Sequence, residues 1–95
     1  MNDRELKAFV LIAETGRMDV AAKMLGYSQP AISYQIKSLE STLGTKLFVR
    51  DSTGARLTRE GRMILPAARA ALALLTSLRE ATSDGQEPPL DLASS

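Results

Sequence analysis

Hydrophobic residues in the first 16 positions recur at helical spacing. The stripe repeats at i, i+3, i+4 and i+7 and consists of Leu6, Phe9, Val10 and Ala13. Asn2 is a suitable N-cap, and Glu5 three residues later completes a capping-box pattern. Gly16 can end the helix in the left-handed conformation. This pattern predicts a first helix between residues 2 and 16.

Two further helical segments follow, and each ends at a glycine. The second is short, with Asp19 as its expected N-cap and Gly26 at its end. The third begins at its expected N-cap Ser28 and ends at Gly44. Its apolar stripe consists of Ile32, Ile36, Leu39 and Leu43. Only two residues separate the second helix from the third, which is typical of a helix-turn-helix unit.

The periodicity changes after residue 45. The segment KLFVR at 46–50 is rich in strand-forming residues and is followed by the turn cluster DSTGA, so residues 46–57 predict a small β-hairpin. Thr58 is the expected cap of a long helix over residues 59–82. Pro66 removes one backbone hydrogen bond inside this helix, which predicts a kink or a loosened turn. Residues 83–95 have the composition of a linker or tail.

The long helix carries a heptad-like apolar seam. The seam repeats every four and three residues and consists of Ile64, Ala68, Ala71, Leu75 and Leu78. It fits packing against the chain's own core or against a partner. A helix of this length extends about 36 Å, more than a small core needs, and Leu65, Leu72 and Leu74 widen its apolar surface. We therefore expect one face to pack inward and another to form a dimer across a two-fold axis. The predicted dimerisation residues are those of the seam, Ile64, Ala68, Ala71, Leu75 and Leu78.

The predicted fold class is mainly α. It is a winged helix-turn-helix of three helices plus a small β-hairpin wing over residues 1–58, followed by a long dimerisation or linker helix over residues 59–82. Residues 83–95 are predicted to be a flexible tail or hinge.

Composition excludes several kinds of site. The 95 residues include neither cysteine nor histidine, so disulfides, thiolate metal sites and histidine bases are absent. The glutamates are scattered without metal-ligand spacing, and we predict no catalytic residue, no metal and no cofactor. No apolar run reaches the roughly 20 residues that span a bilayer, and the N-terminus does not resemble a signal peptide. We therefore expect a cytoplasmic protein without a membrane segment.

Basic residues gather in the middle of the chain. Residues 37–69 contain seven lysines and arginines against three acidic residues, although the net charge of the chain is only +1. Arg50 and Arg56 lie one on each arm of the predicted hairpin. Charge alone does not distinguish a solvated surface from a nucleic-acid-binding one.

The third helix has an unusual polar face. Gln29, Ser33 and Lys37 are four residues apart and lie opposite the apolar stripe. Glutamine can bind adenine with two hydrogen bonds, serine can pair with several base edges, and the small Ala31 can contact a thymine methyl. Free N–H groups at the start of this helix also suit a phosphate. The alternative is an ordinary solvated face.

These segments resemble the N-terminal DNA-binding domain of LysR-type transcriptional regulators over residues 3–82. The matching motifs are LKAFVLIAETG, AAKMLGYSQPAISYQIKSLESTLGTKLFVR and RLTREG. The resemblance implies a bacterial, cytoplasmic regulator that binds double-stranded DNA as a dimer, with helix 28–43 in the major groove and wing 46–57 on the backbone or minor groove. The implied DNA-binding residues are Ser28, Gln29, Pro30, Ala31, Ser33, Tyr34, Lys37, Arg50 and Arg56.

The chain departs from the family pattern in three respects. Tyr34 stands where the family often has arginine, and Arg-Met-Asp at 17–19 replaces a usual Ser-Phe-Thr. Full regulators also carry a longer effector-binding domain, which residues 83–95 are too few to supply. We therefore favour a fragment over a stand-alone DNA-binding protein, with any small-molecule effector bound only by the absent domain. The alternatives are another winged-helix regulator, of the molybdate-responsive type, and a helical protein–protein docking module.

Overall fold

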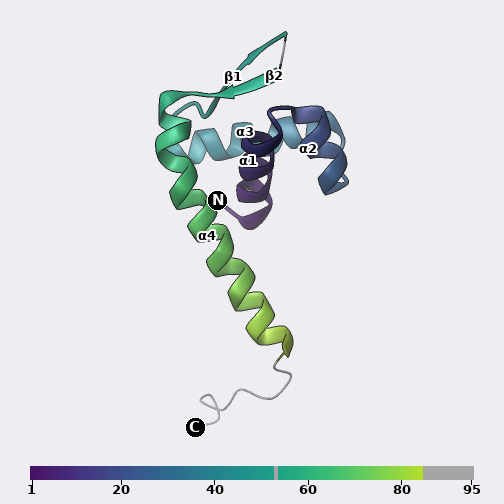
Figure 1. Ribbon diagram of the computed structural model, residues 1–95, viewed down its shortest axis with the longest axis vertical. Coiled ribbons are helices and arrows are strands. Elements are labelled where there is room, and N and C mark those ends of the chain that lie inside the picture. The colour runs from purple at the N-terminus through teal and green to yellow at the C-terminus, as the bar shows by residue number, and fades with distance from the viewer. Residues whose placement is uncertain (53, 85–95) are drawn as a thin grey trace.

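The computed structural model describes residues 1–52 and 54–84 of the chain. The elements are, in order, α1 (Asp3–Thr15), α2 (Met18–Leu25), α3 (Gln29–Leu43), β1 (Phe48–Asp51), β2 (Gly54–Leu57) and α4 (Arg59–Asp84). Helices α1 to α3 form a bundle, the hairpin lies at one end of it, and α4 runs past the bundle (Figure 1). This arrangement confirms the predicted winged helix-turn-helix followed by a long helix. The predicted domain limits stay a prediction, and the expected tail lies outside the described residues from position 85.

The core joins all three bundle helices to the hairpin. Its largest fully buried side chains are Phe9, Ile12, Ile32, Leu39 and Leu47. The rings of Phe9 and Phe48 meet edge to face, with their centroids 5.6 Å apart. Aromatic pairs in this geometry are stabilised beyond the area that they bury. Phe48 therefore anchors the first strand of the wing to α1.

Three of the predicted helix caps are confirmed. Asn2 Oδ1 accepts a hydrogen bond from the Glu5 amide at 2.9 Å, Ser28 Oγ accepts from the Ala31 amide at 3.2 Å, and Thr58 Oγ1 accepts from the Gly61 amide at 2.9 Å. Each side chain satisfies an N–H group that the helix itself leaves without a partner.

Two local predictions are wrong. Asp19 is not the cap of α2, because the helix begins at Met18 and Asp19 lies within its first turn, where its carboxylate pairs with Arg17. The Glu5 carboxylate does not complete the capping box either. It is buried and accepts a hydrogen bond from Ser38 Oγ at 2.7 Å, so it links α1 to α3 instead.

Two glycines let backbone segments approach closely around the wing. Gly54 has φ +136°, and a Cβ there would collide with the carbonyl oxygen of Gly16. That same oxygen accepts a hydrogen bond from the Ala55 amide at 3.1 Å. At Gly61, in the first turn of α4, a Cβ would collide with the carbonyl oxygen of Leu47. The wing is thus held directly between the end of α1 and the start of α4.

The predicted seam of α4 lies mostly against the chain's own core. Ala68 is buried, and half-buried side chains pack on the same core at Ile64, Ala71 and Leu75. Of the five predicted positions only Leu78 is exposed. Among the exposed apolar residues of α4, five follow one another along one face of the helix: Met63, Ala67, Ala70, Leu74 and Leu78. We call this set the outward stripe.

Ion pairs also fix α4 along α1. Arg69 Nη2 lies 3.6 Å from Glu14 Oε2, and Arg79 Nη2 donates to Asp3 Oδ2 at 2.6 Å. The hydrogen bond from Arg79 lowers the pKa of Asp3. The helix continues without interruption through Pro66.

Helix α4 is also unusually apolar for its length. By length and composition alone, Arg59–Thr82 would suffice to cross a membrane, which the sequence prediction had not recognised. A buried core helix of a soluble protein passes the same test, but α4 packs along α1 by one face only and most of this stretch is exposed. The contact with α1 accounts for one apolar face, which leaves the outward stripe to be explained.

Candidate nucleic-acid interface

Helix α3 presents the predicted polar face to solvent because its other face is the core. Ile32, Ile36 and Leu39 are 0–2% exposed and fix the helix in rotation. On the outer side Gln29 and Lys37 are exposed and Ser33 is half-buried. Tyr34 is 70% exposed, further round the helix from the wing than Ser33. The structure therefore brings the amide, hydroxyl, phenol and ammonium groups to one surface.

The first turn of α3 combines a cap with accessible backbone. Ser28 and Pro30 are exposed, and Ala31 is half-buried. Ser28 Oγ accepts from the Ala31 amide, and proline in the first turn removes a donor that the helix does not need. Ser28 thus has a structural role at the predicted site, and its hydroxyl proton remains to donate to a ligand.

The two wing arginines lie on opposite faces of the hairpin. In the antiparallel register Arg50 is opposite Ala55 and Arg56 is opposite Val49. Arg50 therefore shares the face of buried Ala55 and reaches α3, where its Nη2 donates a hydrogen bond to Ser33 Oγ. Arg56 lies on the outer face, with its Nε 3.2 Å from Asp51 Oδ2. Arg50 therefore belongs to the α3 surface, whereas Arg56 does not contact it.

Glu40 sets the distance between α3 and the wing, a role that the sequence analysis missed. Its Oε2 accepts from the amides of Leu47 at 2.7 Å and Phe48 at 3.4 Å. Its Oε1 lies 3.8 Å from Lys46 Nζ. Glu40 lies four residues after Ile36, so helical spacing in the sequence could have placed it on the same edge of α3. The two strand amides that Glu40 binds were not predictable from spacing.

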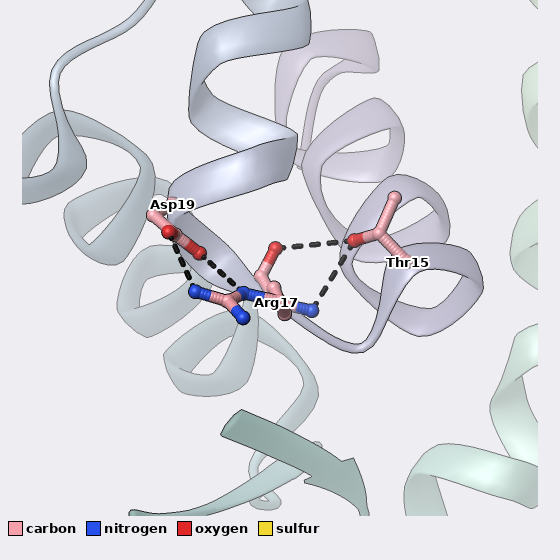
Figure 2. Close-up of polar contacts among 3 residues, drawn as sticks. All are labelled: Thr15, Arg17 and Asp19. Atoms are coloured by element: carbon pink, nitrogen blue, oxygen red, sulfur yellow. Dashed lines mark hydrogen bonds and ion pairs between the residues drawn. The ribbon is translucent and has the colours of Figure 1, made fainter. Parts of the chain in front are cut away.

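Arg17 and Asp19 form a second polar feature that the sequence analysis did not assign to the site. The guanidinium of Arg17 donates twice to the Asp19 carboxylate, at 3.0 Å each, and Thr15 Oγ1 accepts from the Arg17 amide at 3.3 Å (Figure 2). These hydrogen bonds lower the pKa of Asp19 and raise that of Arg17. Both stay ionised at neutral pH, so the pair adds little net charge.

These groups surround an open hollow between α2, α3 and the wing. Its lining includes Arg17, Asp19, Gln29 and Arg50. A neighbouring hollow is lined by Arg50 together with Lys37 and Lys46. Arg50 therefore stands between the two. Cations beside amide and hydroxyl groups on an exposed helix suit a ligand that combines phosphates with polar edges. Among the described residues, no group of three or more acidic side chains could hold a metal ion.

Comparison with known proteins assigns the chain to a family. The family described as "Bacterial regulatory helix-turn-helix protein, lysR family" matches residues 4–62. The HTH-type transcriptional regulator TfdT of Cupriavidus pinatubonensis is 44% identical over 75 residues, which cover 79% of this chain and 33% of TfdT. The chain thus spans about a third of that relative.

Solved structures agree with this assignment. The structure titled "Crystal structure of CbnR_DBD-DNA complex" is 38% identical and has a TM-score of 0.81. The match covers 92% of this chain and 100% of that chain. A Corynebacterium glutamicum OxyR mutant is 30% identical, with a TM-score of 0.84 over 90% of this chain and 28% of the other. The resemblance seen in the sequence is confirmed, and the protein belongs to the LysR family of bacterial regulatory helix-turn-helix proteins.

Proposed function

We propose that this chain is the DNA-binding part of a LysR-type transcriptional regulator and binds double-stranded DNA sequence-specifically, with α3 in the major groove. The observation that carries the proposal is the exposed polar face of α3, where Gln29, Ser33 and Lys37 lie beside Arg50. The similarity to a DNA complex of the CbnR DNA-binding domain over 92% of this chain supports it. An α-helix fits the major groove, where base edges carry a distinct pattern of donors and acceptors.

The proposed contacts divide by chemistry. Gln29 reads a base edge, and Ala31 meets an apolar group such as a thymine methyl. Ser28 and Pro30 bring the start of α3 close to a phosphate. Tyr34 reaches the backbone on the side away from the wing, and Lys37 reaches it beside Arg50. Arg56 binds backbone or minor groove from the outer face of the hairpin, where it has to exchange Asp51 for a phosphate.

We also propose that the protein acts as a homodimer through α4, with the outward stripe as the contact. The exposed fractions of Met63, Leu74 and Leu78 are 68%, 67% and 65%. Successive members of the stripe are 4, 3, 4 and 4 residues apart, so they form one continuous line on the helix. This line lies roughly a third of a turn from the inward face of α4. A second copy would cover it and bring two α3 helices to two half-sites.

The proposed role carries further expectations. A regulator of this kind acts in the bacterial cytoplasm and is not an enzyme; the relatives are transcriptional regulators, which supports this. A small-molecule effector would bind a further domain. Dimer formation is enough to explain why the outward stripe is apolar. We therefore propose no membrane partner.

We expect binding to duplex DNA to weaken steeply as salt rises, because each phosphate neutralised by a cation releases counterions. We expect Gln29→Ala to cost about 1–3 kcal/mol on the preferred site and much less on unrelated sequences. Fluorescence anisotropy with a duplex selected from a random pool, over a series of salt concentrations, measures both effects.

Gln35→Ala is the matched control, because it removes the same side chain from a half-buried position of α3 away from Lys37. It should leave the preference between duplexes unchanged. Binding that does not respond to salt would contradict the proposed function and favour a protein-docking helix. An equal effect of the two substitutions on sequence preference would contradict the role of Gln29.

A further inference from the structure

We propose that Arg50 determines sequence specificity by orienting the hydroxyl of Ser33, so that Ser33 selects a base that presents a hydrogen-bond acceptor. This inference rests on the proposed function. A wing arginine at the backbone would strengthen binding to every sequence alike. The contact between Arg50 and Ser33 connects the wing to base reading instead.

The surrounding structure holds Arg50 in this position. Arg50 shares a strand face with Phe48, which is buried against Phe9. Its partner across the hairpin is Ala55, which is 7% exposed and whose amide donates to the Gly16 carbonyl. Glu40 ties the start of β1 to α3. Strand and helix are therefore fixed relative to one another, and the guanidinium reaches Ser33 from a rigid base.

The hydrogen bond leaves Ser33 with a defined polarity. A guanidinium has only donors, so Ser33 Oγ must be the acceptor in this contact. The single hydroxyl proton then points away from Arg50, and the adjacent positive charge makes it a stronger donor. In the major groove, acceptors are N7 of the purines, O6 of guanine and O4 of thymine, whereas cytosine presents an amino donor. Ser33 should therefore disfavour cytosine at the position that it faces.

Arg50 keeps donors for a second contact. One of its five N–H groups is used on Ser33. Its side chain also lines both hollows, one with Gln29 and one with Lys37. The remaining donors can bind a phosphate at the edge of the groove while Nη2 stays on Ser33. One residue thereby couples the position of the backbone to the base read by α3.

The test compares four proteins: the wild type, Ser33→Ala, Arg50→Ala and the double variant. Each first selects bound duplexes from a random pool. Affinities are then measured on the preferred duplex and on the same duplex with cytosine at the position that Ser33 faces. We expect the wild type to disfavour cytosine by roughly fivefold to tenfold at one position. Both single variants should lose this preference at the same position. The double variant should lose no more, because the two residues act as a unit.

Arg56→Ala is the matched control, since it removes a wing arginine from the opposite face of the hairpin. It should weaken binding to all sequences equally and keep the selected motif. If Arg50→Ala behaves like Arg56→Ala while Ser33→Ala relaxes one position, the proposal for Arg50 is overturned and the proposed function stands. If the wild type selects no sequence at all, the proposed function fails as well. Circular dichroism melting of each variant confirms that the fold is retained.

Discussion

Leu74→Asp is expected to turn a dimer into a monomer. Leu74 is 67% exposed in the middle of the outward stripe, so aspartate costs the isolated chain little. In a two-fold contact the same position would bury two carboxylates near one another, which is strongly unfavourable. On a duplex with two half-sites, affinity should fall by about 10²–10⁴, because the second half-site is no longer bound within one complex. On a single half-site, affinity should be unchanged. Sedimentation equilibrium and binding to the two duplexes measure these effects.

Ala73→Asp provides the matched control. Ala73 is exposed on the same helix but lies outside the outward stripe. It introduces the same charge, and the dimer should persist. A dimer that survives Leu74→Asp would exclude the outward stripe as the contact. A monomeric wild type at high concentration would exclude dimer formation through α4 altogether.

The seam of α4 shows what periodicity can and cannot predict. Spacing of 4 and 3 residues correctly indicates which side chains need an apolar neighbour, and Ala68 and Leu75 have one. It does not say whether that neighbour belongs to the same chain or to a second copy, since both require the same spacing. The exposed fractions separate the two cases, and they shift the proposed contact from Leu75 to Leu74.

Helix ends were predictable where the interaction is local. Ser28 and Thr58 cap their helices through hydrogen bonds to amides three residues ahead, so sequence distance specifies the contact. The prediction for Asp19 was wrong because Arg17, two residues earlier, offers its carboxylate two charge-assisted hydrogen bonds. A charged neighbour can thus compete for a residue that is otherwise a good cap.

In the candidate site, too, local features were predictable from the sequence and contacts between distant residues were not. The outer face of α3 follows from helical spacing, and Gln29 and Lys37 lie where they were expected. The contact of Arg50 with Ser33 joins residues 17 positions apart on different elements, and no local pattern encodes it. The opposite orientation of Arg56 follows from a strand register that the hairpin fixes only after folding.

Gly61→Val is expected to destabilise the domain more than any substitution on its surface. A Cβ at this position collides with the Leu47 carbonyl oxygen and presses on Leu57 Cδ2, and the carbonyl belongs to backbone that cannot turn aside. Overpacking of this kind costs up to about 3 kcal/mol. That corresponds to a fall in Tm of roughly 10–20 °C for a domain of this size.

The sign of the change in stability shows whether tertiary packing or helix propensity dominates at Gly61. Valine is a slightly better helix former than glycine, so propensity alone predicts a small gain in stability from Gly61→Val. Ala73→Val places the same side chain on the exposed side of α4 and should cost only about 0.5 kcal/mol. Thermal melts of both variants measure the difference. A Tm for Gly61→Val at or above that of the wild type would show that α4 does not need its close approach to Leu47.

If the approach is needed, DNA affinity should fall with stability. The Leu47 amide also binds Glu40 of α3, and a displaced strand would move Arg50 away from Ser33.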